Sequence, residues 1–223
     1  DERWAQLEAR GSVDLSHDAG PLGRFRINVC KHRNGLSAIC RIIPNTVPSP
    51  ADLGLPRVLS QFGQLANGLV LVTGPTGTGK STTIAAMLRE INERDSLHIL
   101  TLEDPIEFMH TSQGCQVVQR EVGTHVNSFQ EGLRSALRED PDVILVGELR
   151  DPDTVMLALE AAETGHLVLG TLHTRGAAAT IERLVDAHPS ENHAQVRHAL
   201  AENLKAVVSQ ELIRCVDGRG RRA

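Results

Sequence analysis

The chain has 223 residues, and 40% of them are hydrophobic, which is enough for one or two domains with a sizeable core. A net charge of −5 and only five aromatic residues argue against a nucleic-acid partner, because neither an overall positive field nor stacking platforms are present. The four cysteines form no CxxC pair, the N-terminus is charged, and no apolar run approaches the ~20 residues of a membrane span. We expect a cytoplasmic protein without a membrane span and, because it begins with Asp, a piece of a longer protein.

The N-terminal part is predicted to be a small β-rich domain. Asp1–Arg10 has the composition of a short helix end, and Arg24–Cys30 alternates polar and apolar residues as a half-buried strand does. A turn at Asn34-Gly35 leads to Leu36–Ile43, the predicted antiparallel partner. The alternation places Arg24, Arg26 and Asn28 on one exposed face.

Four prolines between residues 44 and 56 interrupt the regular pattern, because proline cannot continue a helix or a central strand. We interpret residues 44–56 as a linker between a partial domain at residues 1–43 and a larger domain at residues 57–223. Strands and helices then alternate, which predicts an α/β fold with a parallel sheet. The expected strands are Leu69–Thr73, His98–Leu102, Val143–Val146 and Leu167–Thr171. The expected helices are Lys80–Asn92, Phe129–Arg138, Pro152–Glu163, Ala177–Asp186 and His193–Ala206.

Residues 74–81 read GPTGTGKS between an apolar run and a helical pattern, which is a P-loop in its strand-loop-helix context. The glycines allow backbone N–H groups to surround an anion at a helix N-terminus. An ordinary glycine-rich turn is the alternative, and the GKS ending in this context argues against it. We expect the chain to bind a nucleoside triphosphate, ATP, with Mg²⁺. The residues assigned to the nucleotide are Thr76, Gly77, Thr78, Gly79, Lys80, Ser81 and Thr82, with Ser81 also assigned to the metal.

An acidic residue follows the buried-strand run Asp142–Val146. In many P-loop proteins an Asp at the end of such a strand serves the Mg²⁺, whereas here Gly147 occupies that position and the carboxylate of Glu148 follows it. We therefore assign Glu148 to polarising the attacking water. The alternative is an ordinary acid at the start of a loop.

Further polar residues follow other predicted strands. Glu103 begins an acidic cluster after one strand, and His173 follows another, at the end of a parallel sheet where ligands bind. His173 can sense a γ-phosphate there, whereas His166 lies at the opposite strand end and is expected to be structural. Arg134 and Arg138 are four residues apart on a predicted helix, and by themselves they indicate a solvated face.

Four motifs in this order resemble the secretion ATPase superfamily that powers type II secretion and type IV pili, and within it the pilus retraction branch. The resembling segments are GPTGTGKSTT (residues 74–83), His98–Phe108, Leu133–Asp151 and Ala161–Thr174. The resemblance covers residues 24–213. It implies a homohexamer in which a PAS-like domain precedes a RecA-like P-loop core and ATP hydrolysis rotates the domains against each other.

The resemblance also implies site residues and partners. Glu148 corresponds to the catalytic glutamate, and Glu103 and His173 correspond to groups of the Asp and His boxes. The arginine positions of the superfamily correspond to Arg26, Arg41, Arg134 and Arg138, which for the last two replaces the interpretation as a solvated face. The implied location is the cytoplasmic face of the inner membrane, where a pilus platform protein is the partner.

The chain departs from the family pattern at both ends, where members are longer, and it lacks a tetracysteine module. The missing module favours the retraction branch over the type II secretion and pilus-assembly ATPases, which stay as the alternative. A RecA-like nucleic-acid translocase and a nucleotide-binding module without turnover are more distant alternatives. The low aromatic content argues against the first, and Lys80 with Glu148 argues against the second.

Overall fold

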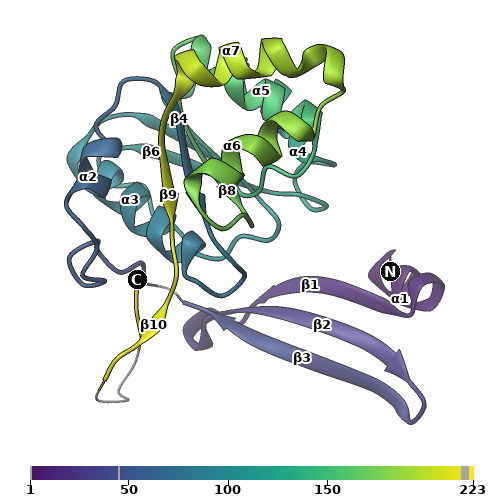
Figure 1. Cartoon of the computed structure of the whole chain (residues 1–223). Helices are drawn as coiled ribbons and strands as arrows, with labels where there is room; N and C mark the ends of the chain where they lie inside the picture. The colour runs from purple at the N-terminus through teal and green to yellow at the C-terminus, as the bar shows by residue number, and fades with distance from the viewer. Residues whose placement is uncertain (1, 45, 217–220) are drawn as a thin grey trace. The chain divides into compact units, whose positions relative to one another are not determined.

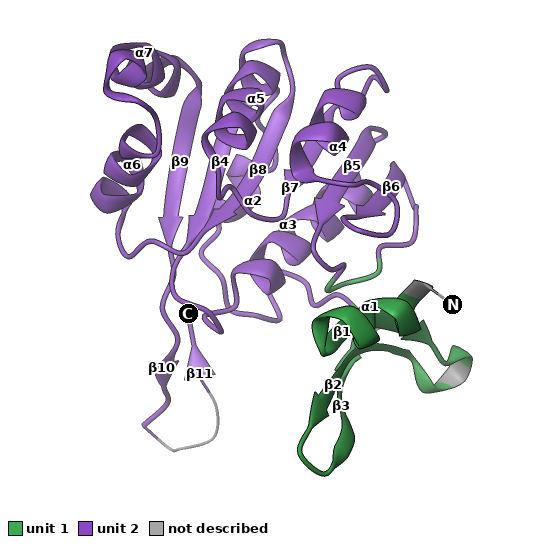
Figure 2. Ribbon diagram, turned by 90° about the vertical axis from the view of Figure 1, so that its right-hand side faces the viewer, with its two compact units in different colours: residues 1–46, 107–109 green, residues 47–106, 110–223 purple. Residues whose placement is uncertain are grey.

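The computed structural model describes residues 2–44, 46–216 and 221–223 and divides the chain into two compact units. Unit 1 contains residues 1–46 and 107–109, and unit 2 contains residues 47–106 and 110–223, as Figure 2 shows in two colours. The proline-rich residues 47–56 therefore belong to unit 2. Their attachment includes a hydrogen bond of 2.6 Å from the Arg89 guanidinium to the Val47 carbonyl.

Unit 1 is a three-stranded antiparallel sheet in the order β1-β2-β3, preceded by helix α1. Its elements are α1 (Glu2–Arg10), β1 (Ser12–Asp18), the 3-10 turn η1 (Gly20–Leu22), β2 (Arg24–His32) and β3 (Gly35–Ile43). The predicted helix, hairpin and turn are confirmed. Strand β1 was not predicted. It pairs with residues 24–30 of β2, and Leu7 of α1 and Val13 of β1 are buried.

Unit 2 is built on a six-stranded sheet in which every pair is parallel, in the order β6-β5-β7-β8-β4-β9. The strands are β4 (Gly68–Thr73), β5 (His98–Glu103), β6 (Gln116–Glu121), β7 (Val143–Val146), β8 (Leu167–Leu172) and β9 (Leu204–Ser209). All six carboxyl ends consequently lie at one edge of the sheet, where ligands bind in open α/β folds. The four predicted core strands are confirmed, and β6 and β9 were not predicted.

Helices cover both faces of this sheet because consecutive side chains of its strands point to opposite faces and are apolar on both. On β4, Leu69 and Leu71 pack into the cluster that includes α4, α5, α6 and α7, whereas Val70 and Val72 pack against α2 and α3. Figure 2 shows α4 to α7 along one side. The bounds are α2 (Val58–Phe62), α3 (Lys80–Arg94), α4 (Phe129–Ala136), α5 (Pro152–Glu163), α6 (Ala177–Asp186) and α7 (His193–Asn203).

Two predicted helices are shorter in the structure than in the prediction. Helix α4 ends at Ala136 instead of Arg138, because the following N–H groups turn to carbonyls three residues back and Asp140 takes a positive φ of 53°. Helix α7 ends at Asn203 instead of Ala206, because the backbone becomes extended at Leu204 and pairs with β4 as strand β9. Helix α5 begins after the N-cap Asp151, whose carboxylate accepts from the Thr154 N–H.

Beyond β9 the chain runs into a small antiparallel pair, β10 (Ile213–Arg214) and β11 (Arg221–Arg222), visible at the lower end of the yellow segment in Figure 1. A 3-10 turn, η2 (Ser190–Asn192), precedes α7. Among the residues that the structure describes, no helix combines the length and the apolar character that crossing a membrane requires.

Candidate nucleotide-binding site

The loop between β4 and α3 has the backbone geometry that a phosphate-binding loop requires. Gly74, Gly77 and Gly79 have positive φ angles of 144°, 80° and 89°, a region that residues with a Cβ rarely adopt. Gly79 is the N-cap of α3, so the loop leads directly into a helix N-terminus. Thr76 and Gly77 at its tip are exposed, and a Cβ built on Gly77 would meet no atom within 4 Å. The loop therefore has both the backbone conformation and the exposure to solvent that anion binding requires.

Lys80 is buried at the base of this loop, with 7% of its surface exposed. Its ammonium group donates to the carbonyl oxygens of Gly74, at 2.9 Å, and Pro75, at 3.2 Å. A buried ammonium needs such acceptors, and phosphate oxygens are stronger ones because they are charged. Ser81 and Thr82, the next residues of α3, are half-buried. The residues present thus fit a bound nucleotide phosphate.

His173, which follows β8, connects the loop with Glu148, which follows β7. Its Nδ1 lies 3.4 Å from the Lys80 Nζ and 3.5 Å from the Thr76 hydroxyl, and its Nε2 lies 3.3 Å from a Glu148 carboxylate oxygen. Because the Lys80 ammonium can only donate, Nδ1 is the acceptor and Nε2 carries the proton that faces Glu148. The structure therefore brings together four of the predicted residues: Thr76, Lys80, His173 and Glu148.

Glu148 has a second partner that the sequence did not indicate, the guanidinium of Arg150 at 2.7 Å. Burial acts to raise the pKa of Glu148, but the hydrogen bond and charge of Arg150, together with His173, outweigh it and hold the pKa below its ordinary value. Glu148 is consequently ionised near neutral pH. Only 19% of its side chain is exposed, compared with 69% of Arg150, so the pair lies at the border between the protein and solvent.

Gly147 directly follows β7, so the carboxylate of Glu148 stands two residues beyond the end of the strand. A Cβ at this position would lie 3.1 Å from the Leu102 carbonyl oxygen and 3.3 Å from the Glu103 Cα, both backbone atoms of β5. The Thr171 hydroxyl also donates to the Gly147 carbonyl at 2.5 Å. The chain just after β7 is thus packed tightly between its neighbours β5 and β8, and a side chain at residue 147 would crowd the backbone of β5.

Glu103, at the end of β5, is held by its own sheet. One carboxylate oxygen accepts from the Thr101 hydroxyl at 2.7 Å and from the Gln119 amide at 3.1 Å. His166, predicted to be structural, is bonded to the Ala161 carbonyl at 2.9 Å at the other end of the sheet. These contacts orient both side chains before any ligand binds.

The four predicted arginines are not part of this cluster of contacts. Arg26 and Arg41 are directly opposite on β2 and β3 of unit 1, and Arg26 lies 3.9 Å from the Asp14 carboxylate. Arg134 and Arg138 are exposed on unit 2, Arg138 beyond the end of α4. Glu139, which directly follows Arg138, pairs with Arg120 at 2.8 Å.

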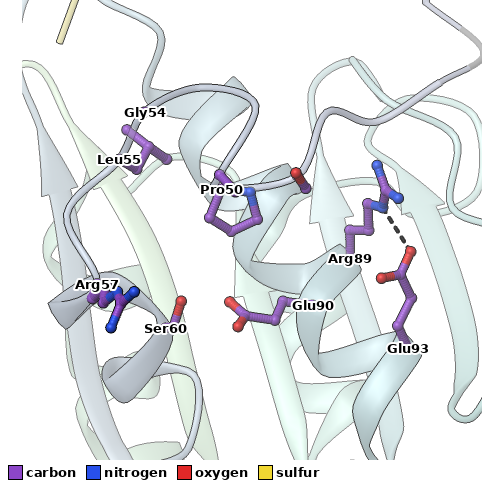
Figure 3. A pocket seen from close by; sticks show the side chains of 10 residues that line it. Pro50, Gly54, Leu55, Arg57, Ser60, Arg89, Glu90 and Glu93 are labelled. Atoms are coloured by element: carbon purple, nitrogen blue, oxygen red, sulfur yellow. Dashed lines mark hydrogen bonds and ion pairs between the residues drawn. The ribbon is translucent and has the colours of Figure 1, made fainter.

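A pocket of about 500 Å³ lies along the last two turns of α3 and is a separate feature. Figure 3 shows Arg89, Glu90 and Glu93 of α3 facing the segment around Pro50 and Leu55. Arg89 lies nine positions after Lys80 on α3, which is about 13 Å along the helix axis. The pocket therefore takes no part in the P-loop site.

The strand-loop-helix unit, with Lys80 and a strand-ending acid connected to it, defines the class of P-loop nucleoside triphosphatases. The chain belongs to the family described as type II/IV secretion system protein, whose model matches residues 50–222. It is 54% identical over 209 residues to the twitching motility protein of Neisseria gonorrhoeae, covering 94% of this chain and 56% of that protein. It is 51% identical over 218 residues to the type IV pilus retraction ATPase PilT of Pseudomonas aeruginosa, covering 98% and 63%.

Among solved structures, the chain is similar to a crystal structure of the pilus retraction motor PilT with bound ADP. The TM-score is 0.95 at 49% identity, and the match covers 99% of this chain and 64% of that one. These similarities confirm the predicted α/β fold class with a parallel-sheet P-loop core. The chain spans about 56–64% of the length of the proteins it resembles here.

Proposed function

We propose that this chain binds ATP with Mg²⁺ at the loop of residues 74–82 and hydrolyses it. The observation that carries the proposal is the connected series Lys80, His173 and Glu148, with contacts of 3.4 Å and 3.3 Å, at the carboxyl edge of the sheet. In this series a cation for phosphate, a hydrogen-bonding sensor and an ionised acid converge from three neighbouring strands. An ordinary glycine-rich turn requires none of the three.

The roles follow from the chemistry of each group. When phosphate binds, the Lys80 ammonium donates its hydrogen bonds to phosphate oxygens in place of the loop carbonyls. Ser81 and Thr82 supply hydroxyl groups at the helix N-terminus. Glu148, ionised by its partners, accepts a proton from the attacking water. His173 connects the two, so a change at the phosphate reaches Glu148 through one imidazole ring. Mg²⁺, when bound, neutralises the negative charge that develops on the phosphates.

The whole protein is proposed to be a homohexameric motor that couples this reaction to type IV pilus retraction, and thus to pilin depolymerisation and twitching motility. The similarity to PilT and to a twitching motility protein supports this choice. Arg26 and Arg41 of the small domain and Arg134 and Arg138 of the core supply positive charge to nucleotide in the assembly. The proposed divisions are a small domain at residues 1–43, a linker at residues 44–56, of which residues 47–56 pack with unit 2, and a core at residues 57–223.

The proposed place of action is the cytoplasmic face of the inner membrane, against a pilus platform protein. The alternative within the same family is a type II secretion or pilus-assembly ATPase, and the family model covers both systems by its description. Expression of the full-length gene in a strain without its retraction ATPase distinguishes them. Restored twitching supports retraction, and restored pilus growth or secretion without retraction supports the alternative.

The test of the catalytic proposal compares Lys80→Ala with Glu148→Gln. Lys80→Ala removes a phosphate ligand, so affinity for ATP falls. Glu148→Gln keeps the shape and removes the base, so ATP binds with unchanged affinity and persists without hydrolysis. Glu163→Gln, the same substitution at an exposed position at the end of α5, is the control. Hydrolysis by Glu148→Gln at the rate of the parent chain would show that Glu148 is not the base.

A further inference from the structure

Gln210 contacts the P-loop from the side opposite His173. It directly follows β9, the edge strand beside β4, and its backbone N–H donates to the Thr73 carbonyl at 2.8 Å. Its side chain, in a residue only 7% exposed, reaches the loop and the first turn of α3. Nε2 donates to the Thr78 carbonyl at 2.7 Å, and Oε1 accepts from the Thr83 hydroxyl at 2.8 Å.

The chemistry of both contacts fits glutamine. A backbone carbonyl only accepts, which assigns the amide nitrogen to the Thr78 side, and the oxygen then receives the Thr83 hydroxyl. Glutamate in its ionised form lacks the donor, lysine lacks the acceptor, and alanine leaves two buried polar groups without a partner. A neutral group with one donor and one acceptor, spaced as in an amide, is what the two contacts require.

Two P-loop glycines are packed directly against this residue. A Cβ on Gly74 would lie 2.3 Å from the Gln210 carbonyl oxygen, and a Cβ on Gly79 would lie 3.0 Å from Gln210 Nε2. The glycines of the loop therefore have a second role besides their positive φ angles. They allow the backbone to approach Gln210 closely enough for its amide to reach the Thr78 carbonyl.

The bond to Thr78 also controls a donor that faces the other way. In a trans peptide the C=O and the following N–H point in opposite directions, so holding the Thr78 carbonyl toward Gln210 directs the Gly79 N–H away from it. We propose that Gln210 is a positioning residue that holds the Thr78–Gly79 peptide with the Gly79 N–H toward the phosphate site before nucleotide arrives. This inference rests on the proposed nucleotide binding.

The test uses Gln210→Glu and measures ADP affinity as a function of pH. A protonated carboxyl group can donate to the Thr78 carbonyl and accept from Thr83, whereas the ionised form cannot donate. Relative to the parent chain, the affinity of Gln210→Glu therefore falls as pH rises, to about tenfold weaker where the carboxyl is ionised. Gln64→Glu, the same change at an exposed glutamine, gives a ratio to the parent that does not vary with pH.

A second variant and a second measurement distinguish the loss of the two hydrogen bonds from misfolding of the variant. Gln210→Met fills the same space without hydrogen bonds, and its ADP affinity is expected to be about tenfold weaker at every pH, with the fold checked by circular dichroism. Exchange of the Thr83 amide hydrogen, which bonds to the Gly79 carbonyl at 2.9 Å, is measured without nucleotide. In Gln210→Met this exchange is expected to be faster than in the parent chain.

The outcomes separate this inference from the proposed function. If the parent chain does not bind ADP, the proposed function fails, and the exchange measurement alone decides whether Gln210 holds the loop. If the parent binds ADP while Gln210→Glu and Gln210→Met match it in affinity at every pH, the positioning role is refuted. Slower or equal Thr83 exchange in Gln210→Met refutes it as well.

Discussion

Replacing Gly74 with alanine is expected to destabilise the fold by more than its backbone angle explains. The new Cβ would lie 2.3 Å from the Gln210 carbonyl oxygen and 2.9 Å from the Thr78 hydroxyl. The first of these is a backbone atom whose residue is bonded to Thr73, so it cannot rotate away. A positive φ costs a residue with a Cβ about 1–2 kcal/mol, and overpacking costs about 1–3 kcal/mol more. The free energy of unfolding should therefore fall by about 2–5 kcal/mol.

Two other glycines separate the contributions. Gly77 and Gly165 have φ angles of 80° and 109°, but a Cβ on either would meet no atom within 4 Å, so Gly77→Ala and Gly165→Ala carry only the backbone cost of about 1–2 kcal/mol. Urea unfolding followed by circular dichroism measures all three variants against the parent chain. Equal losses for Gly74→Ala and Gly165→Ala would refute the argument that Gly74 is required by its contact with Gln210.

Two further predictions concern charge in and around the site. Arg150→Ala removes a cation that lowers the pKa of Glu148, so the pKa of this carboxylate is expected to rise. Because Glu148 then loses its base form at a higher pH on acidification, the acidic limb of the pH–rate profile should move to higher pH. An unshifted limb would contradict the role of Arg150. Arg26 and Arg41 lie in unit 1, outside the unit that carries the P-loop, so activity per subunit should rise with protein concentration as hexamers form. In Arg26→Ala or Arg41→Ala, the activity should be lower than that of the parent chain by about 10³ or more. Activity per subunit that is constant from monomer to hexamer would argue against this.

The sequence predicted the parts of the fold that local patterns determine. The P-loop, the four central strands and the helices from residues 80 to 186 each have a continuous apolar run or a helical period with a cap, and the structure has an element at each. The prediction missed strand β9 because the apolar residues in this segment also have helical spacing, as at Leu200, Leu204, Val207 and Val208. Pairing with β4 makes the second half of the segment a strand instead of a helix. The prediction missed strand β6 because its sequence, QVVQRE, is mostly polar and forms a strand through its pairing with β5.

The site was predictable as a set of residues but not as a set of contacts. A motif identifies Lys80, Glu148 and His173, whereas their distances depend on which strands are neighbours, and sheet order is not visible in one sequence. Gln210 was missed for this reason, whereas Arg150 is only two residues from its partner Glu148 and was missed because no motif singled it out. Gln210 is a single amide 127 residues beyond Thr83, and no spacing rule joins them.

Sheet order explains how the site is divided. In the sequence β7-β8-β4-β9, the carboxyl ends present Glu148, His173, the P-loop and Gln210 in that order. On the β8 side the loop contacts His173, at 3.4 Å from Lys80 and 3.5 Å from Thr76, and His173 in turn lies 3.3 Å from the Glu148 carboxylate. On the β9 side it meets a neutral amide with two bonds of 2.7 and 2.8 Å, which holds backbone and takes no proton. Under the proposed roles, we therefore expect substitutions at Glu148 and His173 to change the rate of the chemical step, and substitutions at Gln210 to change the affinity of the loop for nucleotide.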